Sequence, residues 1–346
     1  MKTILFLFGG VSSEYAVSLE SAQAVLTHLD QSKFRPLMVG ITKDGRWLHY
    51  TGAVDAIGAD RWQDAPCVPC TLVLHRGARQ LLLLDGTGAT RSFDAAFPVM
   101  HGKNGEDGTL QGLLELAGVP IVGCGTLASA LSMDKDRAHK LAACAGVDIP
   151  RGMVFSQGAA PGDWNAAAEE LGYPLFVKPV RAGSSFGITR VTAPSQLSAA
   201  LEEAWRHDRE ALLEEAVPGF EVGCAVLGTK TLTVGAVDQV SLSQGFFDYE
   251  EKYTLKTASI HCPAPILPEE AARIQAAAKV VYRALDLKGF ARVDFFLTPG
   301  GRVVFNEVNT IPGFTAHSRY PRMMAATGLL FPALITRLID EEVEGA

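Results

Sequence analysis

The sequence predicts an α/β protein in which a parallel-sheet domain precedes two smaller α+β lobes. An apolar run at residues 4–8 ends in two glycines and leads into a helical pattern, as a strand buried in a parallel sheet does. A glycine-rich loop at residues 180–187 lies between two short strand patterns, and a longer hairpin pattern occupies residues 289–309. The predicted units are residues 1–128, 129–222 and 223–346.

The composition is that of a folded protein with small ligands. Of the 346 residues, 48% are hydrophobic and 20% are charged, which excludes a disordered chain. The formal net charge of -7 argues against nucleic acid or an anionic membrane as the main partner, but it allows a small anion held by local cations. No apolar run reaches the roughly 18 residues of a membrane span, and the N-terminal run is too short for a signal peptide. We expect a cytoplasmic protein.

The six cysteines are scattered, and only Cys67 and Cys70 are closely spaced. A zinc site would need a second such pair or histidines at ligand spacing, and neither follows. We therefore expect reduced thiols.

The first unit alternates strands and helices. After the first strand, helical spacing is found at residues 18–29 and further strands are expected at residues 37–41 and 93–99. A polar loop at residues 101–108 then leads into a helix at residues 109–117. This order is typical of an α/β domain.

The second and third units read as α+β lobes. A helix begins at Ala130 and continues through Lys140. The other elements expected in these lobes are strands at residues 175–179, 188–191 and 211–217, helices at residues 197–205 and 268–285, and the final hairpin.

The final hairpin collects the most informative polar side chains. If Leu297 pairs with Arg302 across the turn, Arg292 lies opposite Glu307. The side chains that this register directs to one face are Arg292, Asp294, Glu307 and Asn309. Two carboxylates and an amide oxygen suit a hard cation such as Mg²⁺, which completes its shell with substrate phosphates. The alternative, a solvated face with one Arg–Glu pair, does not explain why the opposite face is apolar.

The loop at residues 181–187 suits a polyphosphate. Its glycines and serines let backbone N–H groups approach phosphate oxygens. It is not a P-loop, because no Gly-Lys-Ser/Thr ends it and no helix follows. Lys178 supplies a cation for phosphate, and Lys135 can supply a second. An ordinary hairpin turn and an exposed helix lysine are the alternatives.

Two further segments fit a nucleotide site. Residues 212–221 form a strand whose exit can present backbone groups to a purine, with Glu221 placed for ribose hydroxyls. Residues 245–253 are charged and aromatic, as active-site lids often are. The alternatives are an ordinary strand exit and a partly buried loop.

These elements, in this order, resemble the ATP-grasp superfamily and, within it, the D-alanine–D-alanine ligase family. The resemblance covers essentially the whole chain. It is carried by residues 9–18, 101–112, 133–135, 178–185, 249–253, 292–294 and 306–313. It implies an ATP-grasp fold whose two lobes enclose ATP. It also implies a cytoplasmic, homodimeric ligase that makes a D-alanyl-D-amino-acid dipeptide for peptidoglycan and splits ATP to ADP and phosphate.

The resemblance assigns the nucleotide and metal residues. Two Mg²⁺ or Mn²⁺ ions would lie on Asp294, Glu307 and Asn309. The ATP phosphates would contact Lys135, Lys178 and Lys252, and the adenosine would contact Glu214, Glu215, Val217 and Glu221. The carboxylate of the first D-alanine would attack the γ-phosphate, and the amine of the second substrate would attack the acyl-phosphate.

The resemblance assigns the amino-acid substrates to a second group of residues. Glu14 would hold the amino group of the first D-alanine. Ser184 and Tyr253 would hydrogen-bond with Glu14, and His101 would line the same subsite. Arg292 and the backbone N–H of Gly313 would stabilise the oxyanion. The second substrate would bind at Ser318, beside His317.

Two positions depart from the commonest pattern of the family. Arg319 stands where many members have an apolar residue, and Phe247 stands where many have Tyr. In these positions the chain resembles the vancomycin-resistance ligases that make D-alanyl-D-serine. The hydroxyl of D-serine needs a partner, which a polar network around Arg319 can supply. No histidine accompanies residues 251–253, which resembles amide-forming members rather than D-lactate ligases.

Three alternatives remain open. The chain can be a housekeeping D-alanine–D-alanine ligase, an ATP-grasp ligase for a different carboxylate and amine, or a nucleotide-binding module without turnover. Glu14, Ser184 and Tyr253 argue against a different substrate class, because together they shape a small amino-acid site. Arg292 argues against a binding module, because a binder needs no cation at an oxyanion.

Overall fold

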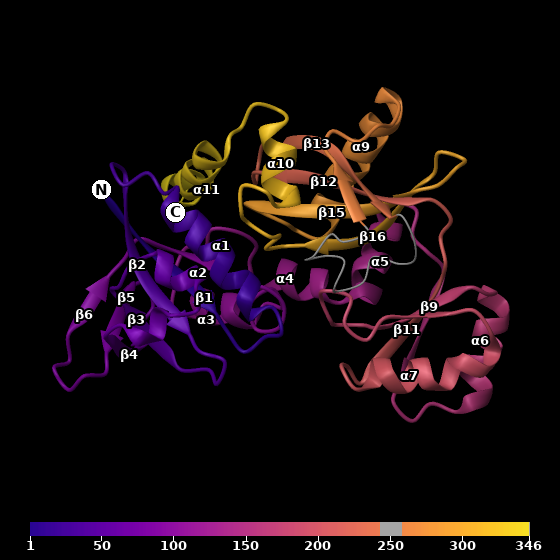
Figure 1. Cartoon of the computed structure of the whole chain (residues 1–346), viewed down its shortest axis with the longest axis horizontal. Coiled ribbons are helices and arrows are strands. Elements are labelled where there is room, and N and C mark those ends of the chain that lie inside the picture. Colours follow the sequence, from indigo (N-terminus) through magenta and orange to yellow (C-terminus); the bar gives the residue numbers. More distant parts are fainter. Residues whose placement is uncertain (243–257, 346) are drawn as a thin grey trace.

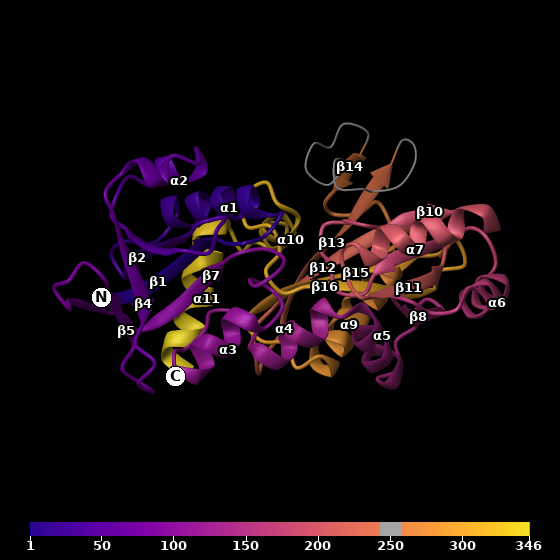
Figure 2. The same ribbon diagram turned by 90° about the horizontal axis from the view of Figure 1, so that it is seen from below.

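The computed structural model describes the backbone of residues 1–242 and 258–345. Three β-sheets follow one another along an elongated molecule, and helices pack on each of them (Figures 1 and 2). The α/β class predicted from the sequence is confirmed.

The first sheet has seven strands and is parallel only at its centre. Their order is β6 (Thr90–Ser92), β5 (Gln80–Leu83), β4 (Cys67–Leu72), β3 (Trp47–Tyr50), β2 (Phe34–Ile41), β1 (Lys2–Gly9) and β7 (Ala95–Val99). Strand β1 pairs in parallel with β2 and β7, whereas β3 to β6 form an antiparallel extension. The predicted parallel core is confirmed, and the sheet as a whole is mixed.

Both faces of the first sheet are covered, which explains the uninterrupted apolar sequence of β1. Ile4 and Phe6 face a cluster that includes helices α1 (Tyr15–Thr27) and α11 (Phe331–Gly345). Leu5 and Leu7 face the opposite cluster, which includes α3 (Thr109–Leu116). A short helix, α2 (Asp55–Gly58), lies beside α1.

Helix α11 returns the end of the chain to the first sheet (Figure 1). The sequence groups these residues with the third unit, but their apolar side chains pack with those of β1 and β7. The unit boundaries themselves stay a prediction.

A connection of two helices leads into the central lobe. The sequence predicts one continuous helix from Ala130, which is wrong, because α4 (Thr126–Met133) and α5 (Lys135–Cys144) are separated at Asp134. Asp134 has an extended backbone, with φ -87° and ψ 100°, and its carboxylate accepts a hydrogen bond from the N–H of Arg137 at 3.0 Å. This N-cap starts a new helix whose first residue is Lys135.

The central lobe is a four-stranded antiparallel sheet. The strands lie in the order β10 (Thr189–Val191), β9 (Leu175–Pro179), β11 (Glu210–Glu215) and β8 (Gly152–Ser156). Helices α6 (Pro161–Leu171) and α7 (Leu197–Trp205) share an apolar cluster with this sheet. The predicted hairpin of β9 and β10 around the glycine-rich loop is confirmed.

The third sheet has five antiparallel strands. Their order is β14 (Ala258–His261), β13 (Thr233–Leu242), β12 (Phe220–Leu227), β15 (Phe290–Leu297) and β16 (Val303–Asn309). Helix α9 (Pro268–Ala284) packs on the apolar face of β15, and α10 (Arg319–Ala325) contacts β12 and β13. The last strand, β16, therefore forms one edge of this sheet.

The cysteines and the helices bear on the expectations drawn from composition. All six cysteines are free thiols, as predicted. None of the helices in the described part of the chain has the length and apolar composition needed to span a bilayer.

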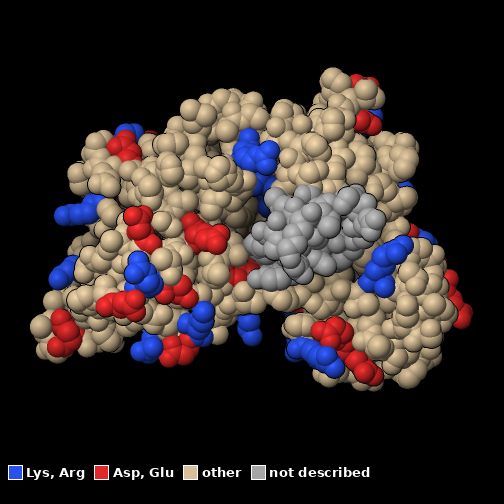
Figure 3. Space-filling model, viewed as in Figure 1, with Lys and Arg blue, Asp and Glu red and all other residues tan. Residues whose placement is uncertain are grey.

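Basic and acidic side chains are interspersed on the face drawn in Figure 3.

Candidate active site

The turn between β15 and β16 is one residue longer than predicted. Leu297 pairs with Val303 and not with Arg302. The N–H of Thr298 donates to the carbonyl of Arg302 at 3.0 Å, and the N–H of Gly301 donates to the carbonyl of Thr298 at 2.8 Å. These bonds place Arg302 within the turn.

A β-bulge at Asn306 brings the polar side chains back to one face. Asp294 lies opposite Glu307, and Arg292 lies opposite Asn309, whereas the predicted register paired Arg292 with Glu307. The longer turn and the bulge each shift the pairing by one residue. Because the two shifts add up to two residues, the same side chains stay on the same face of the hairpin. The predicted pairs are wrong, but the four side chains share a face as expected.

Asp294 is buried, with 1% of its surface exposed, and its carboxylate is enclosed by donors. Nε and Nη2 of Arg292 donate to its two oxygens, each at 2.8 Å, and Nδ2 of Asn309 donates to Oδ2 at 3.0 Å. Together with Glu307 on the neighbouring strand, these residues offer oxygen ligands and no thiolate or imidazole. This donor set fits a hard divalent cation.

No group of three or more His, Cys, Asp or Glu side chains in residues 1–242 and 258–345 is arranged to hold a metal ion, and the hairpin brings together two carboxylates and an amide. The assignment of a metal to this hairpin stays a prediction, which rests on the chemistry of its donors.

A cavity of about 30 Å³ joins the hairpin to the glycine-rich loop. Its lining residues are Glu106, Ser132, Met133, Lys135, Ala182, Gly183, Ser184, Glu307, Val308, Asn309 and Thr310. The predicted phosphate loop, one predicted phosphate lysine and two predicted metal ligands thus face the same space.

Two of the three predicted phosphate lysines, Lys135 and Lys178, are buried and hydrogen-bonded. Nζ of Lys135 donates to the carbonyl of Ala182 in the glycine-rich loop at 2.6 Å. Lys178 on β9 forms an ion pair with Glu214 on β11. The other oxygen of Glu214, Oε2, is buried without a hydrogen-bond partner. The residues predicted for phosphate and for adenine therefore meet between these two strands.

The remaining adenosine residues lie at the exit of β11. Glu215 accepts a hydrogen bond from Nε of Arg151 at 2.7 Å, and Val217 is half-buried two residues further along. Their contacts with adenosine stay a prediction.

Glu14 and Ser184 meet as the sequence predicts. Glu14 directly precedes α1, and its carboxylate accepts a hydrogen bond from the hydroxyl of Ser184. Ser184 and Ser185 have φ values of 50° and 58°, in the left-handed region that costs a residue with a Cβ of order 1–3 kcal/mol. A Cβ on Gly183 would come within 3.1 Å of Oε2 of Glu14, so glycine permits this close approach.

His101 connects the first sheet to the segment that follows the metal hairpin. Its Nδ1 lies 2.8 Å from the carbonyl of Ile311, which can only accept, so Nδ1 carries the proton. Nε2 then accepts from the hydroxyl of Ser21 at 3.1 Å, and that hydroxyl accepts from the N–H of Phe314 at 3.3 Å. Burial lowers the pKa of His101. The ring and the Ser21 hydroxyl thereby connect Ile311 and Phe314, on either side of Gly313, to α1.

Glu106 is a site residue that the sequence did not single out. Its Oε2 accepts from the N–H of Gly102 at 2.8 Å, and its Oε1 accepts from the N–H of Ile311 at 2.9 Å. Burial, and then repulsion from Glu14, raises the pKa of Glu106 to about 8. In the sequence it is one of several polar residues in a loop, and only the fold distinguishes it from Asp107.

The raised pKa of Glu106 predicts that the stability of the folded protein falls as the pH rises from about 4.5 to about 8. Below a pH of about 4.5, folded and unfolded chains both hold the proton, and the contribution of this group to stability is complete. As the pH rises from about 4.5 through 8, the unfolded chain has released the proton while the folded chain still binds it, so the contribution is lost. Urea unfolding at pH 6 and pH 9 should show this fall, and Glu106→Gln should flatten it. An unchanged slope in the variant would contradict the assignment.

Arg319 is buried within a cluster of carboxylates. Its Nε and Nη2 donate to the two oxygens of Asp238, each at 2.8 Å, and its Nη1 donates to Glu221 at 2.7 Å. Nη2 also lies 3.6 Å from Oδ1 of Asp294. A Cβ on Gly223 would come within 2.6 Å of Nη2, so glycine makes room for the cluster. Asp238 carries no sequence signal, because the pairing depends on contact between α10 and β13.

Glu221, predicted to bind ribose, is here held by Arg319. Its contact with ribose stays a prediction.

Ser318, directly before α10, is hydrogen-bonded to Thr315 in the preceding segment. Its hydroxyl accepts from the N–H of Thr315 at 3.1 Å and lies 2.9 Å from the hydroxyl of Thr315. A Cβ on Gly313 would come within 3.2 Å of the same hydroxyl. Gly313, the predicted oxyanion donor, and Ser318, predicted to bind the second substrate, are therefore neighbours, whereas His317 is exposed. Phe247, Lys252 and Tyr253 lie outside the described residues.

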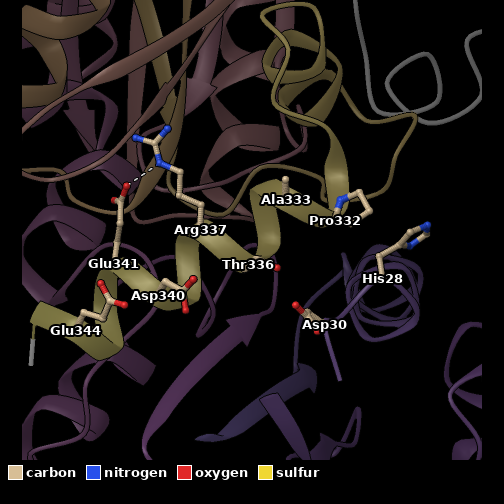
Figure 4. A pocket seen from close by; sticks show the side chains of 9 residues that line it. All are labelled: His28, Asp30, Pro332, Ala333, Thr336, Arg337, Asp340, Glu341 and Glu344. Atoms are coloured by element: carbon tan, nitrogen blue, oxygen red, sulfur yellow. Dashed lines mark hydrogen bonds and ion pairs between the residues drawn. The ribbon is translucent and has the colours of Figure 1, made fainter. Parts of the chain in front are cut away.

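A larger cavity, of about 580 Å³, lies away from these residues (Figure 4). It is lined by His28, Asp30, Pro332, Ala333, Thr336, Arg337, Asp340, Glu341 and Glu344. Arg337 and Asp340 form ion pairs with Glu341 and Lys33, at 2.8 and 3.0 Å. None of the predicted site residues that the structure describes lines it.

Comparison with known proteins identifies the family. The N-terminal model of the D-ala D-ala ligase family matches residues 3–124, and its C-terminal model matches residues 141–340. A putative D-alanine–D-lactate ligase of Streptomyces coelicolor is 46% identical, with 98% of this chain and 97% of the relative covered. Vancomycin B-type resistance protein VanB of Enterococcus faecalis is 44% identical, with 99% and 98% covered.

Among solved structures, VanG D-Ala:D-Ser ligase from Enterococcus faecalis has a TM-score of 0.91 and 51% identity, with 99% of each chain covered. The ATP-grasp fold implied by the sequence is thereby confirmed. These matches span nearly the whole chain, and they show that it is an ATP-dependent ligase, which joins D-alanine to a second small substrate and belongs to the D-alanine–D-alanine ligase family.

Proposed function

We propose that the second substrate is D-serine and that the product is D-alanyl-D-serine, a peptidoglycan precursor of the vancomycin-resistance type. The observation that carries this proposal is the buried Arg319 cluster beside Ser318. The similarity of this chain to the solved ligase that is named for D-Ala:D-Ser also favours the proposal.

The chemistry of the cluster favours a substrate with a hydroxyl group. A hydroxyl that leaves water needs both a donor and an acceptor to replace its hydration. Arg319, the first residue of α10, carries N–H donors, and its Nη2 lies 3.6 Å from Oδ1 of Asp294 in the metal hairpin. Glu221 beside it supplies a carboxylate acceptor, and the fully buried Asp238 holds the guanidinium in place. A site built for D-alanine alone has no use for this polar group, because a methyl group gains nothing from it.

Each group of site residues would have its own role in the reaction. Glu14, to which the hydroxyl of Ser184 donates a hydrogen bond, would hold the ammonium group of D-alanine, so that the substrate carboxylate meets the γ-phosphate of ATP. Lys135 and Lys178 would bind phosphate oxygens, and Asp294, Glu307 and Asn309 would hold two Mg²⁺ or Mn²⁺ ions. When bound, the ions would spread the charge that develops during phosphoryl transfer. Arg292 and the N–H of Gly313 would then stabilise the oxyanion as the second amine attacks.

We also propose that the protein acts in the cytoplasm as a homodimer, as its resemblance to the family implies. Sedimentation would test the oligomeric state, and a monomer at micromolar concentration would contradict it.

The proposed specificity is tested by measuring ADP release with D-alanine and each second substrate in turn. We expect a higher kcat/KM for D-serine than for D-alanine or D-lactate as the second substrate. A higher kcat/KM for D-alanine would favour a housekeeping ligase, and one for D-lactate would favour a depsipeptide ligase such as the Streptomyces relative is named for.

A further inference from the structure

We propose that His139 on α5 is a positioning residue that holds the β-bulge at Asn306 and thereby directs Glu307 toward Asp294. This inference rests on the proposed metal site of the hairpin.

The bulge decides which way Glu307 points. Phe295 pairs with Phe305 on one side of the bulge, and Asp294 pairs with Glu307 on the other, so Asn306 is the extra residue. Without it, the register near the turn would continue and Glu307 would pair with Val293. Val293 is fully buried in the apolar cluster beneath α9, so the carboxylate would face the wrong side of the hairpin.

His139 contacts both residues that define the bulge. The extra residue of a bulge is left unpaired in the ladder, and here the carbonyl of Asn306 lies 2.7 Å from Nε2 of His139. Because that carbonyl can only accept, Nε2 carries the proton and donates it. The imidazole also packs edge-on against Phe305, with ring centroids 5.6 Å apart and an interplanar angle of 80°.

Strand β16 depends on such contacts because it is the edge of its sheet. The N–H of Phe305 donates to the carbonyl of Asp148 at 2.8 Å, and the carbonyl of Asn306 is bound by His139. Both bonds come from α5 or the segment that follows it. The edge is therefore held in its bulged form from outside the sheet.

The other side of His139 faces the nucleotide residues. Nδ1 lies 3.9 Å from Oε2 of Glu214, whose other oxygen binds Lys178. His139 is 5% exposed, so few positions are available to its ring. One buried side chain thus contacts the metal hairpin and lies beside the pair predicted to bind ATP.

Two substitutions separate the hydrogen bond from packing. His139→Phe retains a ring against Phe305 but removes the donor, and His139→Gln keeps an amide donor near the position of Nε2. His139→Met serves as a second donor-free variant if the larger ring prevents folding. Ala142→Gly, at a fully buried position of the same helix, is the matched control for simple destabilisation of α5.

The readouts are the Mg²⁺ concentration that gives half-maximal rate and the calorimetric affinity for ADP with and without Mg²⁺. In a donor-free variant, we expect the Mg²⁺ concentration for half-maximal rate to rise by about tenfold or more. We expect the gain in ADP affinity that Mg²⁺ provides to fall by a similar factor, since partners that orient metal ligands have effects of this size. ADP affinity without Mg²⁺ and the KM for D-alanine should stay near native values. His139→Gln should restore most of the Mg²⁺ response.

The proposal is overturned if the donor-free variants keep a native Mg²⁺ response, if His139→Gln behaves like them, or if Ala142→Gly causes the same shift. Failure of the metal site itself would be recognised separately, because Glu307→Gln would then leave the Mg²⁺ response unchanged. The identity of the second substrate does not enter either readout.

Discussion

Asp294→Asn should lower the rate of ADP formation by on the order of 10³-fold. The substitution keeps the shape of the side chain but removes the charge that a divalent cation needs, and such a cation contributes several kcal/mol to stabilising a phosphoryl-transfer transition state. The rate is measured in single turnover with saturating D-alanine and Mg²⁺. ADP binding without Mg²⁺ should be retained, because Asp294 is not among the predicted nucleotide ligands.

Asp148→Asn is the matched control for this substitution. Asp148 is an exposed carboxylate that pairs with Arg302 at the turn of the same hairpin, at 3.1 Å. Loss of this ion pair should leave the rate within about twofold of the wild-type rate, since exposed ion pairs contribute about 0–1 kcal/mol to stability. An Asp294→Asn enzyme that retained Mg²⁺-dependent turnover would contradict the assignment of the metal site.

Arg319→Leu should destabilise the protein by about 3–5 kcal/mol and lower the preference for D-serine over D-alanine by at least about tenfold. The stability falls because Asp238, which is fully buried, loses the guanidinium that neutralises it. The preference falls because the donor for the substrate hydroxyl is removed. Urea unfolding and the ratio of the two kcat/KM values measure the two effects.

A second substitution distinguishes the two effects of Arg319→Leu. Asp238→Asn removes the uncompensated charge but keeps an acceptor for the N–H of Gly223, which donates to Asp238 at 3.0 Å. The double variant should therefore recover much of the stability and none of the preference. Recovery of D-serine preference along with stability would show that Arg319 acts through folding alone.

The elements that carry a periodic apolar pattern could be predicted from the sequence. Strand β9 and helix α7 have the predicted bounds, because each is delimited by proline, glycine or a clear change of period. The break between α4 and α5 was missed because Asp134 lies inside an otherwise helical pattern, and its capping role depends on the backbone angles.

The site was predictable in its residue types but not in its partners. The alternation of the hairpin placed Asp294 and Glu307 on one face, although neither the longer turn nor the bulge at Asn306 leaves a local signal. Likewise, Arg319 was recognised as unusual, but Asp238 and Glu106 were not. Their importance comes from burial and from contacts over long sequence distances, which no single segment contains.

Competition between second substrates tests the central proposal most directly. The enzyme is given ATP, Mg²⁺ and D-alanine together with equal concentrations of D-serine and D-lactate, and the products are separated and identified by mass. We predict that D-alanyl-D-serine is the main product. Predominant D-alanyl-D-alanine or D-alanyl-D-lactate would contradict the proposal that the second substrate is D-serine.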